Sequence, residues 1–335
     1  MEHEAQRLPT PRGPLSAAVV DCLRASGPAP DPESVADAAP YGDDLQLALY
    51  LCYELHYRGF AGVAPEREWD PEVLRARAAL ERCFLSALRA DAPVHDSVDD
   101  AVADLLVEPV DGAGVSHFLR DEGELWHLRE YAAQRSLYHL KEADPHAWVL
   151  PRLRGRAKAA MAAVEFDEFG GGRADRVHAR LFADLMTDLG LDTTYGHYLE
   201  EASAEALATV NMMSLFGLHR ALRGALVGHF AAVEITSSPG SRRLAEAMRR
   251  TGAGPAAEHF YDEHVEADAV HEQVVRHEVI AGLLEDEPQL ARDVAFGIDA
   301  TSLVEDRLAD RLLSDWRAGR SSLRSRPTSG ISHIS

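Results

Sequence analysis

The sequence has few of the features that mark disulfide-stapled, secreted or membrane-spanning proteins. Its 335 residues include only three cysteines, Cys22, Cys52 and Cys83, which lie far apart and form no CxxC pair. This argues against a disulfide framework and against a structural zinc site. No apolar run approaches the ~20 residues needed to cross a bilayer, and the N-terminal residues lack the apolar segment of a signal peptide. We therefore expect a cytoplasmic protein with no membrane partner.

Basic side chains are also scarce. The chain has 34 Lys and Arg against 55 Asp and Glu, which gives a formal net charge of −21. A chain this acidic repels phosphate backbones, so we expect no nucleic-acid partner. Hydrophobic residues make up 46% of the sequence, enough for a globular core.

Alternating runs of β-branched residues are nearly absent, whereas Ala, Leu, Arg and Glu dominate. This composition, with apolar residues three and four apart, predicts an all-α protein. The predicted helical segments are 43–58, 71–90, 97–107, 125–141, 153–168, 175–189, 203–235, 241–251, 255–283 and 288–317. Breaks are expected at Gly170–Gly172, at Ser237–Gly240 and between Gly252 and Pro255.

The chain divides into four predicted parts. Residues 1–40 are rich in proline and are predicted to be a flexible arm. Residues 41–120 are predicted to be a helical extension, and residues 121–320 the main domain. Residues 321–335 form a Ser/Arg tail without apolar periodicity, which predicts disorder.

The most informative motif combines His264, Asp268 and His271 at positions i, i+4 and i+7. At ~100° per residue the three side chains fall on one narrow stripe of a helix. Two imidazoles and a carboxylate suit Fe, Mn or Zn. The alternative is a polar helix face with two solvated histidines and one salt-bridging aspartate.

Two further elements contain carboxylates in unusual places. Glu234 is predicted to lie in the last turn of a strongly apolar helix, where the helix dipole disfavours an anion. It would then need either a metal ion or a salt bridge to Arg242 or Arg243. Glu168 precedes three glycines that permit a sharp turn, which could bring His178 beside it; an ordinary acidic helix end followed by a loop is the alternative.

Together these motifs resemble the heme-oxygenase-like diiron oxidases and oxygenases, a superfamily of non-heme iron-containing redox enzymes. The resemblance covers approximately residues 125–318. It implies a carboxylate–histidine pair, a middle carboxylate, a late His-x3-Asp-x2-His set and one further upstream glutamate. The corresponding catalytic and metal-binding residues are Glu142, Glu168, His178, Glu234, His264, Asp268 and His271. Glu165, one turn before Glu168, is an alternative ligand.

The resemblance implies a heme-oxygenase-like helical bundle over residues 121–320, with the segment before it as an extension used for dimer contacts. It implies two Fe(II) per chain, of which the second is labile because Asp268 is a short ligand, and O2 as co-substrate. The expected substrate is a small amine, an amino-acid-derived molecule or a fatty-acid-like molecule, in specialised metabolism. N-oxygenation is favoured over C–C cleavage or desaturation because of Glu142. Expected partners are this substrate, an electron donor and a second copy of the chain.

Two other classes of function stay open at this point. One is a non-catalytic helical binding or assembly protein. The other is a ferritin-like iron protein, for which Glu124 and His127 form the one strict Glu-x-x-His motif. Residues that could line a substrate pocket are Phe182, Met186, Met212, Met213 and Phe216, although plain core packing is the common role of such residues. Arginines that could hold a substrate carboxylate are Arg173, Arg220, Arg223, Arg242 and Arg243.

Overall fold

The computed structural model describes residues 6–107 and 112–325, and within these ranges the chain forms helices and no β-strand. The prediction of an all-α protein is confirmed. In the same ranges, no helix is both long enough and apolar enough to cross a membrane.

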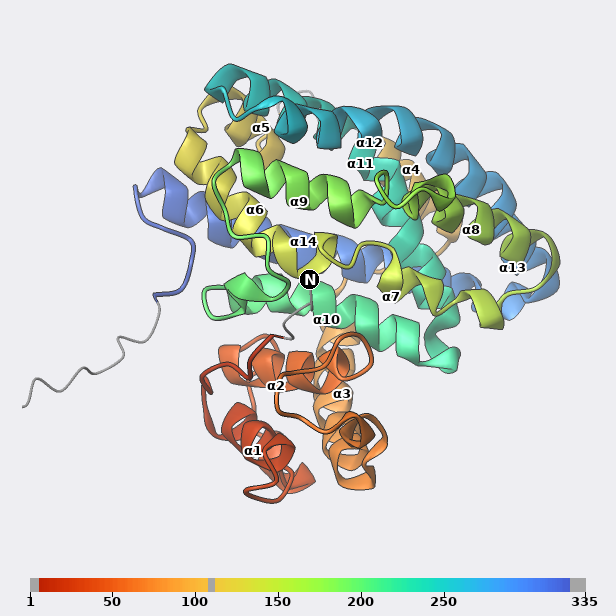
Figure 1. Ribbon diagram of the computed structural model, residues 1–335. Helices are drawn as coiled ribbons and strands as arrows, with labels where there is room; N and C mark the ends of the chain where they lie inside the picture. Colours follow the sequence, from red (N-terminus) through yellow and green to blue (C-terminus); the bar gives the residue numbers. More distant parts are fainter. Residues whose placement is uncertain (1–5, 108–111, 326–335) are drawn as a thin grey trace, which may run out of the picture.

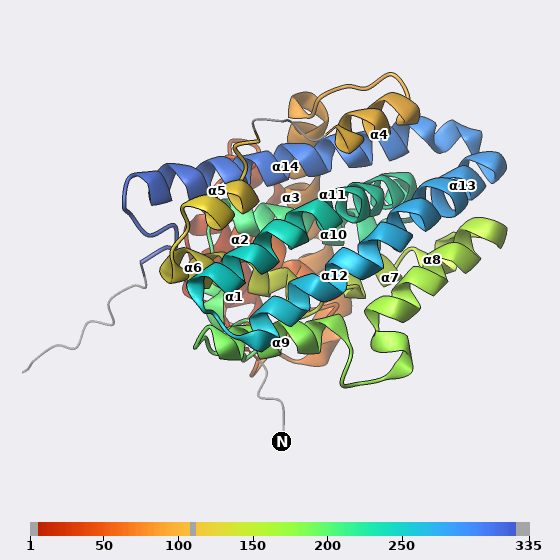
Figure 2. The same cartoon turned by 90° about the horizontal axis from the view of Figure 1, so that it is seen from above.

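Three long helices form the centre of the molecule: α11 (Arg223–Thr251), α12 (Pro255–Val274) and α14 (Ala291–Arg317). Helix α11 packs against both of the others, and the three run side by side in Figure 2. Glycines permit the close approach of α11 and α14. A Cβ atom on Gly228 would lie 1.9 Å from the Val294 carbonyl oxygen, and one on Gly297 would lie 2.0 Å from that of Ala225.

The remaining helices surround this centre (Figure 1). Helix α9 (His178–Asp188) lies along α12. Helix α8 (Gly155–Glu168) lies against the π-helical turn Val275–Ile280, which follows α12 and leads into α13 (Ala281–Asp286). The other helices of this part are α4 (Val98–Leu106), α5 (Val115–Asp121), α6 (Leu125–His139), α7 (Asp144–Ala147) and α10 (Ala204–Leu218).

The N-terminal helices form a separate layer below α10 in Figure 1. They are α1 (Pro14–Leu23), α2 (Asp43–Glu54) and α3 (Pro71–Asp91). Helix α2 packs against α1, α3 and α10. Every residue from Leu45 to Glu54 is buried, so α2 connects this layer to the rest of the core.

The prediction of a flexible arm over residues 1–40 is wrong for α1, while residues 1–5 lie outside the described ranges. Pro14 occupies the first position of α1, where a backbone N–H would have no partner within the helix, so the N–H that proline lacks is not missed. The Asp44 carboxylate accepts hydrogen bonds from the backbone N–H groups of Leu15 and Ser16, which ties the start of α1 to α2.

The predicted disorder of residues 321–335 is also corrected in part. The Glu130 carboxylate accepts hydrogen bonds from the N–H and hydroxyl groups of Ser322, whose carbonyl accepts one from Gln134. Ser322 is therefore held against α6, and residues 326–335 lie outside the described part of the chain.

The helix boundaries confirm the break at Gly252, which has a left-handed φ of 68°. They differ from the prediction at one expected break and at one interruption that was not expected. The expected break at Ser237–Gly240 is absent, because α11 continues through Pro239. Buried side chains on both sides of Pro239, Ile235 and Leu244 among them, keep this segment helical, so tertiary packing overrides local propensity. The interruption comes earlier, at His219 between α10 and α11.

Candidate metal centre

Five separate segments bring the seven predicted site residues to one place inside the protein. Glu142 follows α6, Glu168 ends α8, His178 begins α9 and Glu234 lies on α11, while α12 contributes three side chains. All seven are between 2% and 7% exposed. We call these residues the ligand set: Glu142, Glu168, His178, Glu234, His264, Asp268 and His271.

One half of the ligand set consists of Glu142, His178 and His264, whose ligand atoms lie within 4.8 Å of one another. The His264 Nδ1–H group donates a 2.7 Å hydrogen bond to the Phe260 carbonyl. In the neutral imidazole this bond assigns the proton to Nδ1, so that Nε2, which lies 3.7 Å from Glu142 Oε1, is the nitrogen available to a metal ion. The imidazole is therefore in the tautomer that a metal ligand requires.

The other half consists of Glu168, Asp268 and His271, also within 4.8 Å of one another. Glu234 adjoins it, with its Oε2 atom 3.2 Å from His271 Nδ1. Glu168 lies between the halves, because its Oε2 atom is 2.7 Å from His178 Nδ1 and its Oε1 atom is 3.6 Å from His271 Nδ1. Glu168 could therefore serve as a ligand in either half of the set.

Local backbone geometry explains two of these placements. Gly170, Gly171 and Gly172 have φ values of 72°, 60° and 81°, in the left-handed region that favours glycine. They reverse the chain after α8, and the predicted proximity of His178 to Glu168 is confirmed. On the other side of the site, Ala143 has a φ of 73°, and this turn places Glu142 just after the end of α6.

Glu234 is near the other ligands, but the expected reason for its place is wrong. It lies in the middle of α11 rather than in the last turn, so the helix dipole does not explain it. The expected salt bridge to Arg242 or Arg243 is not found among the described contacts. Arg243 instead donates a hydrogen bond to Ser116, and Glu234 pairs with His271.

Buried polar atoms without partners are concentrated here. Within the described part of the chain, neither Asp268 Oδ2 nor Glu142 Oε2 has a hydrogen bond, and the same holds for Glu234 Oε2 and His264 Nε2. Buried polar groups are normally paired, and an unpaired one costs free energy. The site therefore has unused capacity to coordinate a ligand from N and O atoms.

Without a cation the ligand set retains protons. Burial raises the pKa of Glu234 to about 8 and also raises that of Asp268. Burial disfavours the charged form of His264, but the adjacent Glu142 more than offsets this and raises its pKa to about 10. For His271, Glu234 likewise outweighs burial and raises the pKa to about 9. Four carboxylates and three imidazoles match the charge and the ligand preference of two divalent iron ions.

Glu165, the alternative to Glu168, is buried but belongs to neither half of the ligand set. Burial, followed by the charges of Glu168 and Glu234, raises its pKa to about 9. The ferritin-like motif is also elsewhere, because His127 Nδ1 accepts a hydrogen bond from the Glu124 backbone at the start of α6.

Sequence reasoning missed two residues that contact the ligand set. His139 Nδ1 donates a 2.8 Å hydrogen bond to Glu142 Oε1, and Asp167 Oδ2 lies 3.4 Å from His271 Nε2. A signal for the first was present, because Arg135, His139 and Glu142 have the same i, i+4, i+7 spacing as the ligands on α12.

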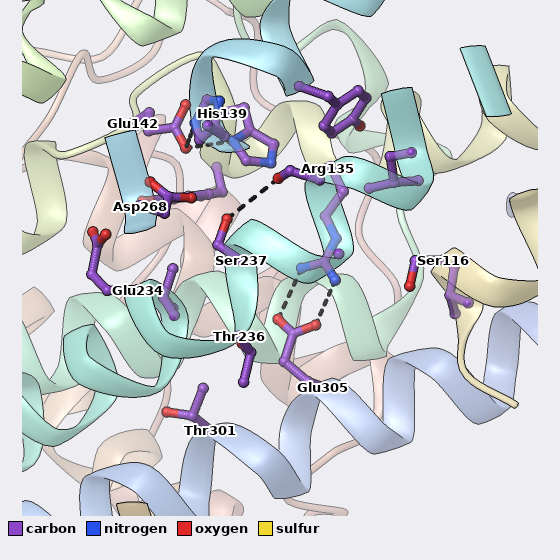
Figure 3. Close-up of a pocket in the computed structure, with 18 of the residues that line it drawn as sticks. Ser116, Arg135, His139, Glu142, Glu234, Thr236, Ser237, Asp268, Thr301 and Glu305 are labelled. Atoms are coloured by element: carbon purple, nitrogen blue, oxygen red, sulfur yellow. Dashed lines mark hydrogen bonds and ion pairs between the residues drawn. The ribbon is translucent and has the colours of Figure 1, made fainter. Parts of the chain in front are cut away.

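A cavity of about 340 Å³ adjoins the ligand set (Figure 3). Of the predicted pocket residues, Met213 lines it, whereas Phe182, Met186, Met212 and Phe216 are buried without lining it. None of the five predicted arginines lines it, but Arg135 does. Its apolar wall includes Phe230, Leu244, Phe260, Leu308 and Leu312.

A comparison with models of protein families matches residues 129–306 to the family described as iron-containing redox enzyme. The matched range contains the complete ligand set. A search of curated proteins found no match.

Proposed function

Because the chain belongs to the family of iron-containing redox enzymes, which have a heme-oxygenase-like fold, we propose that it is a non-heme diiron oxidoreductase that uses O2 to oxidise a small molecule. One observation supports this above all others. Two buried sets of three metal-ligating residues adjoin each other, and Glu168 lies between them.

In this proposal Glu142, His178 and His264 hold one iron. Glu234, Asp268 and His271 would hold the other, and Glu168, which lies between the two sets, would add a carboxylate ligand. When bound, the two irons would supply electrons for the reduction of O2. The protein supplies orientation: the Phe260 carbonyl fixes the tautomer of His264, and His139 holds the Glu142 carboxylate in place.

The two halves of the ligand set have different surroundings. His139, which orients Glu142, is only partly exposed, whereas the side chain of Asp167, which contacts His271, is 61% exposed. An exposed partner holds a ligand less firmly, because solvent screens the interaction. The second set also includes the short Asp268 and precedes a π-helical turn, a local irregularity that is frequent at functional sites. We therefore propose that the second iron binds more weakly.

The cavity has room for a small substrate, which fits the proposed classes of amine, amino-acid-derived molecule or fatty-acid-like molecule. N-oxygenation stays favoured over C–C cleavage and desaturation because Glu142 is part of the ligand set. An electron donor and a second copy of the chain are proposed partners.

Anaerobic titration with Fe(II) tests this function. The wild-type protein should take up two Fe(II) per chain and develop a visible absorption band when O2 is added. His264→Ala should lose the tight site and the band. His259→Ala is the matched control, because His259 is an exposed histidine on the same helix and should leave both unchanged. Two results would contradict the proposal and favour a scaffold protein. One is a wild-type protein that takes up no iron, and the other is a His264→Ala variant that takes up as much iron as the wild type.

A further inference from the structure

An ion pair lines the cavity away from the ligand set. Arg135 on α6 donates hydrogen bonds from both of its Nη groups to the carboxylate of Glu305 on α14. The Nη1–Oε1 distance is 2.8 Å. Figure 3 shows this pair across the pocket from Glu142, Asp268 and Glu234. The two side chains are 19% and 35% exposed and both line the cavity, so a ligand can reach them.

Two helices, α6 and α12, run from this charged end of the cavity toward the ligand set. Arg135 precedes His139 by one turn of α6, ~6 Å along the axis, and Tyr261 precedes His264 by ~4.5 Å on α12. Tyr261 also lines the cavity, and its hydroxyl has no hydrogen-bond partner in the described ranges. The cavity therefore has a charged end next to a spare hydroxyl and a metal-binding end, with apolar side chains between them.

Both members of the pair stay charged. Burial alone would raise the pKa of Glu305, but Arg135 lowers it below the usual range. A ligand with a single charge would pair with one partner and leave the other without its counter-ion, which costs free energy at a partly buried site. A ligand with adjoining positive and negative groups can pair with both at once.

We propose that Arg135 and Glu305 form a head-group subsite for an α-amino acid, an inference that rests on the proposed function and names its substrate class. The carboxylate of the amino acid pairs with Arg135 and accepts a hydrogen bond from Tyr261. The ammonium group pairs with Glu305. The side chain then extends along the apolar wall, past Phe260, toward the ligand set.

Calorimetric binding of two matched ligand triplets tests this subsite. One triplet is L-norleucine, hexanoate and pentylamine, and the other is L-lysine, 6-aminohexanoate and cadaverine. In each triplet the second compound lacks the α-ammonium group and the third lacks the carboxylate. We expect the amino acid of at least one triplet to bind at least tenfold more tightly than both of its analogues. If neither amino acid exceeds its analogues, the pair is only a structural link between α6 and α14.

Single substitutions should change the selectivity in opposite directions. Glu305→Gln should weaken binding of the amino acid at least tenfold while binding of the matching acid is retained. Arg135→Gln should weaken the amino acid similarly and retain the matching amine. Partial unfolding would instead reduce binding of all three ligands equally. Asp306→Asn is the control, because it removes the same charge from a neighbouring cavity residue; an equal loss there would overturn the assignment.

Each titration is run under argon before and after addition of Fe(II), so no turnover is needed. Amino-acid selectivity without iron uptake would support the subsite and contradict the diiron function. Iron uptake without amino-acid selectivity would do the reverse.

Discussion

Two buried polar regions meet at neighbouring residues, Lys141 and Glu142. The charges of one region are paired by protein groups, whereas the other region has polar atoms without a protein partner in the described ranges. Lys141 Nζ lies 2.9 Å from Glu54 Oε2 at the junction of α2 and α6, and both residues are almost fully buried. The Tyr195 hydroxyl donates a second bond to Glu54, and Lys141 also lies 4.0 Å from the centre of the Tyr57 ring. Glu142 belongs to the ligand set, where many donor and acceptor atoms have no protein partner in the described ranges.

This difference distinguishes buried charges that hold the fold together from buried charges that can bind a ligand. A buried ion pair with additional hydrogen bonds satisfies its own groups and fixes the relation of two helices. A buried cluster of like charges is stable only when protons or metal ions complete it. Burial is the same in both regions, so the state of the partners identifies the functional one.

The largest expected effect is on stability, at the buried pair of Lys141 and Glu54. Lys141→Met leaves the buried Glu54 carboxylate without its cation, and we expect the free energy of unfolding to fall by about 3–5 kcal/mol. Urea denaturation of iron-free protein measures it. Lys158→Met is the control, because Lys158 is exposed on α8 and should change stability by less than about 0.5 kcal/mol. A loss below about 1 kcal/mol for Lys141→Met would show that this region is not held by matched charge.

The next effect is the pH dependence of stability that arises from the ligand set and the neighbouring Glu165. In iron-free protein the pKa values of Glu234 and Glu165 are raised to about 8 and 9, and those of His271 and His264 to about 9 and 10. These four groups therefore hold more protons in the folded state than in the unfolded state between pH 6 and 8, so their contribution to stability falls as pH rises. Burial lowers the pKa values of His146 and His229, which offsets part of this effect below pH 7.

We expect this loss to amount to a few kcal/mol over that range, on the order of one for each strongly shifted group. Fe(II) displaces these protons, so it should flatten the pH dependence. Melting temperatures at pH 6, 7 and 8, with chelator or with Fe(II) under argon, measure both effects. Stability of the iron-free protein that rises over this range would contradict the assignment of raised pKa values.

The parts of the site that could be predicted from sequence are those set by local periodicity. His264, Asp268 and His271 lie on one helix, so their spacing alone places them on a common face. The approach of His178 to Glu168 depends on a ten-residue segment with a glycine turn, which is also local. These signals need no knowledge of how distant helices pack.

Features that depend on tertiary packing were missed or misplaced. Arg135 and Glu305 are 170 residues apart, and nothing in either local sequence identifies the other as its partner. Glu234 was placed at a helix end because Pro239 suggested a break, whereas packing on both sides of Pro239 continues α11. Helix α1 was missed because its proline-rich surroundings outweighed the pattern of its buried residues.

The smallest expected effect has the opposite sign to that of Lys141→Met. Asp268→Asn removes a carboxylate whose charged form is disfavoured mainly by burial and also by Glu168, so it should stabilise iron-free protein by about 1 kcal/mol. The same variant should bind one Fe(II) in place of two, because an amide is a poorer ligand than a carboxylate. Asp262→Asn, on the exposed face of α12, should change neither quantity. If Asp268→Asn destabilised the iron-free protein instead, Asp268 would be a matched structural charge like Glu54, and the distinction between the two regions would fail at the residue where it is most specific.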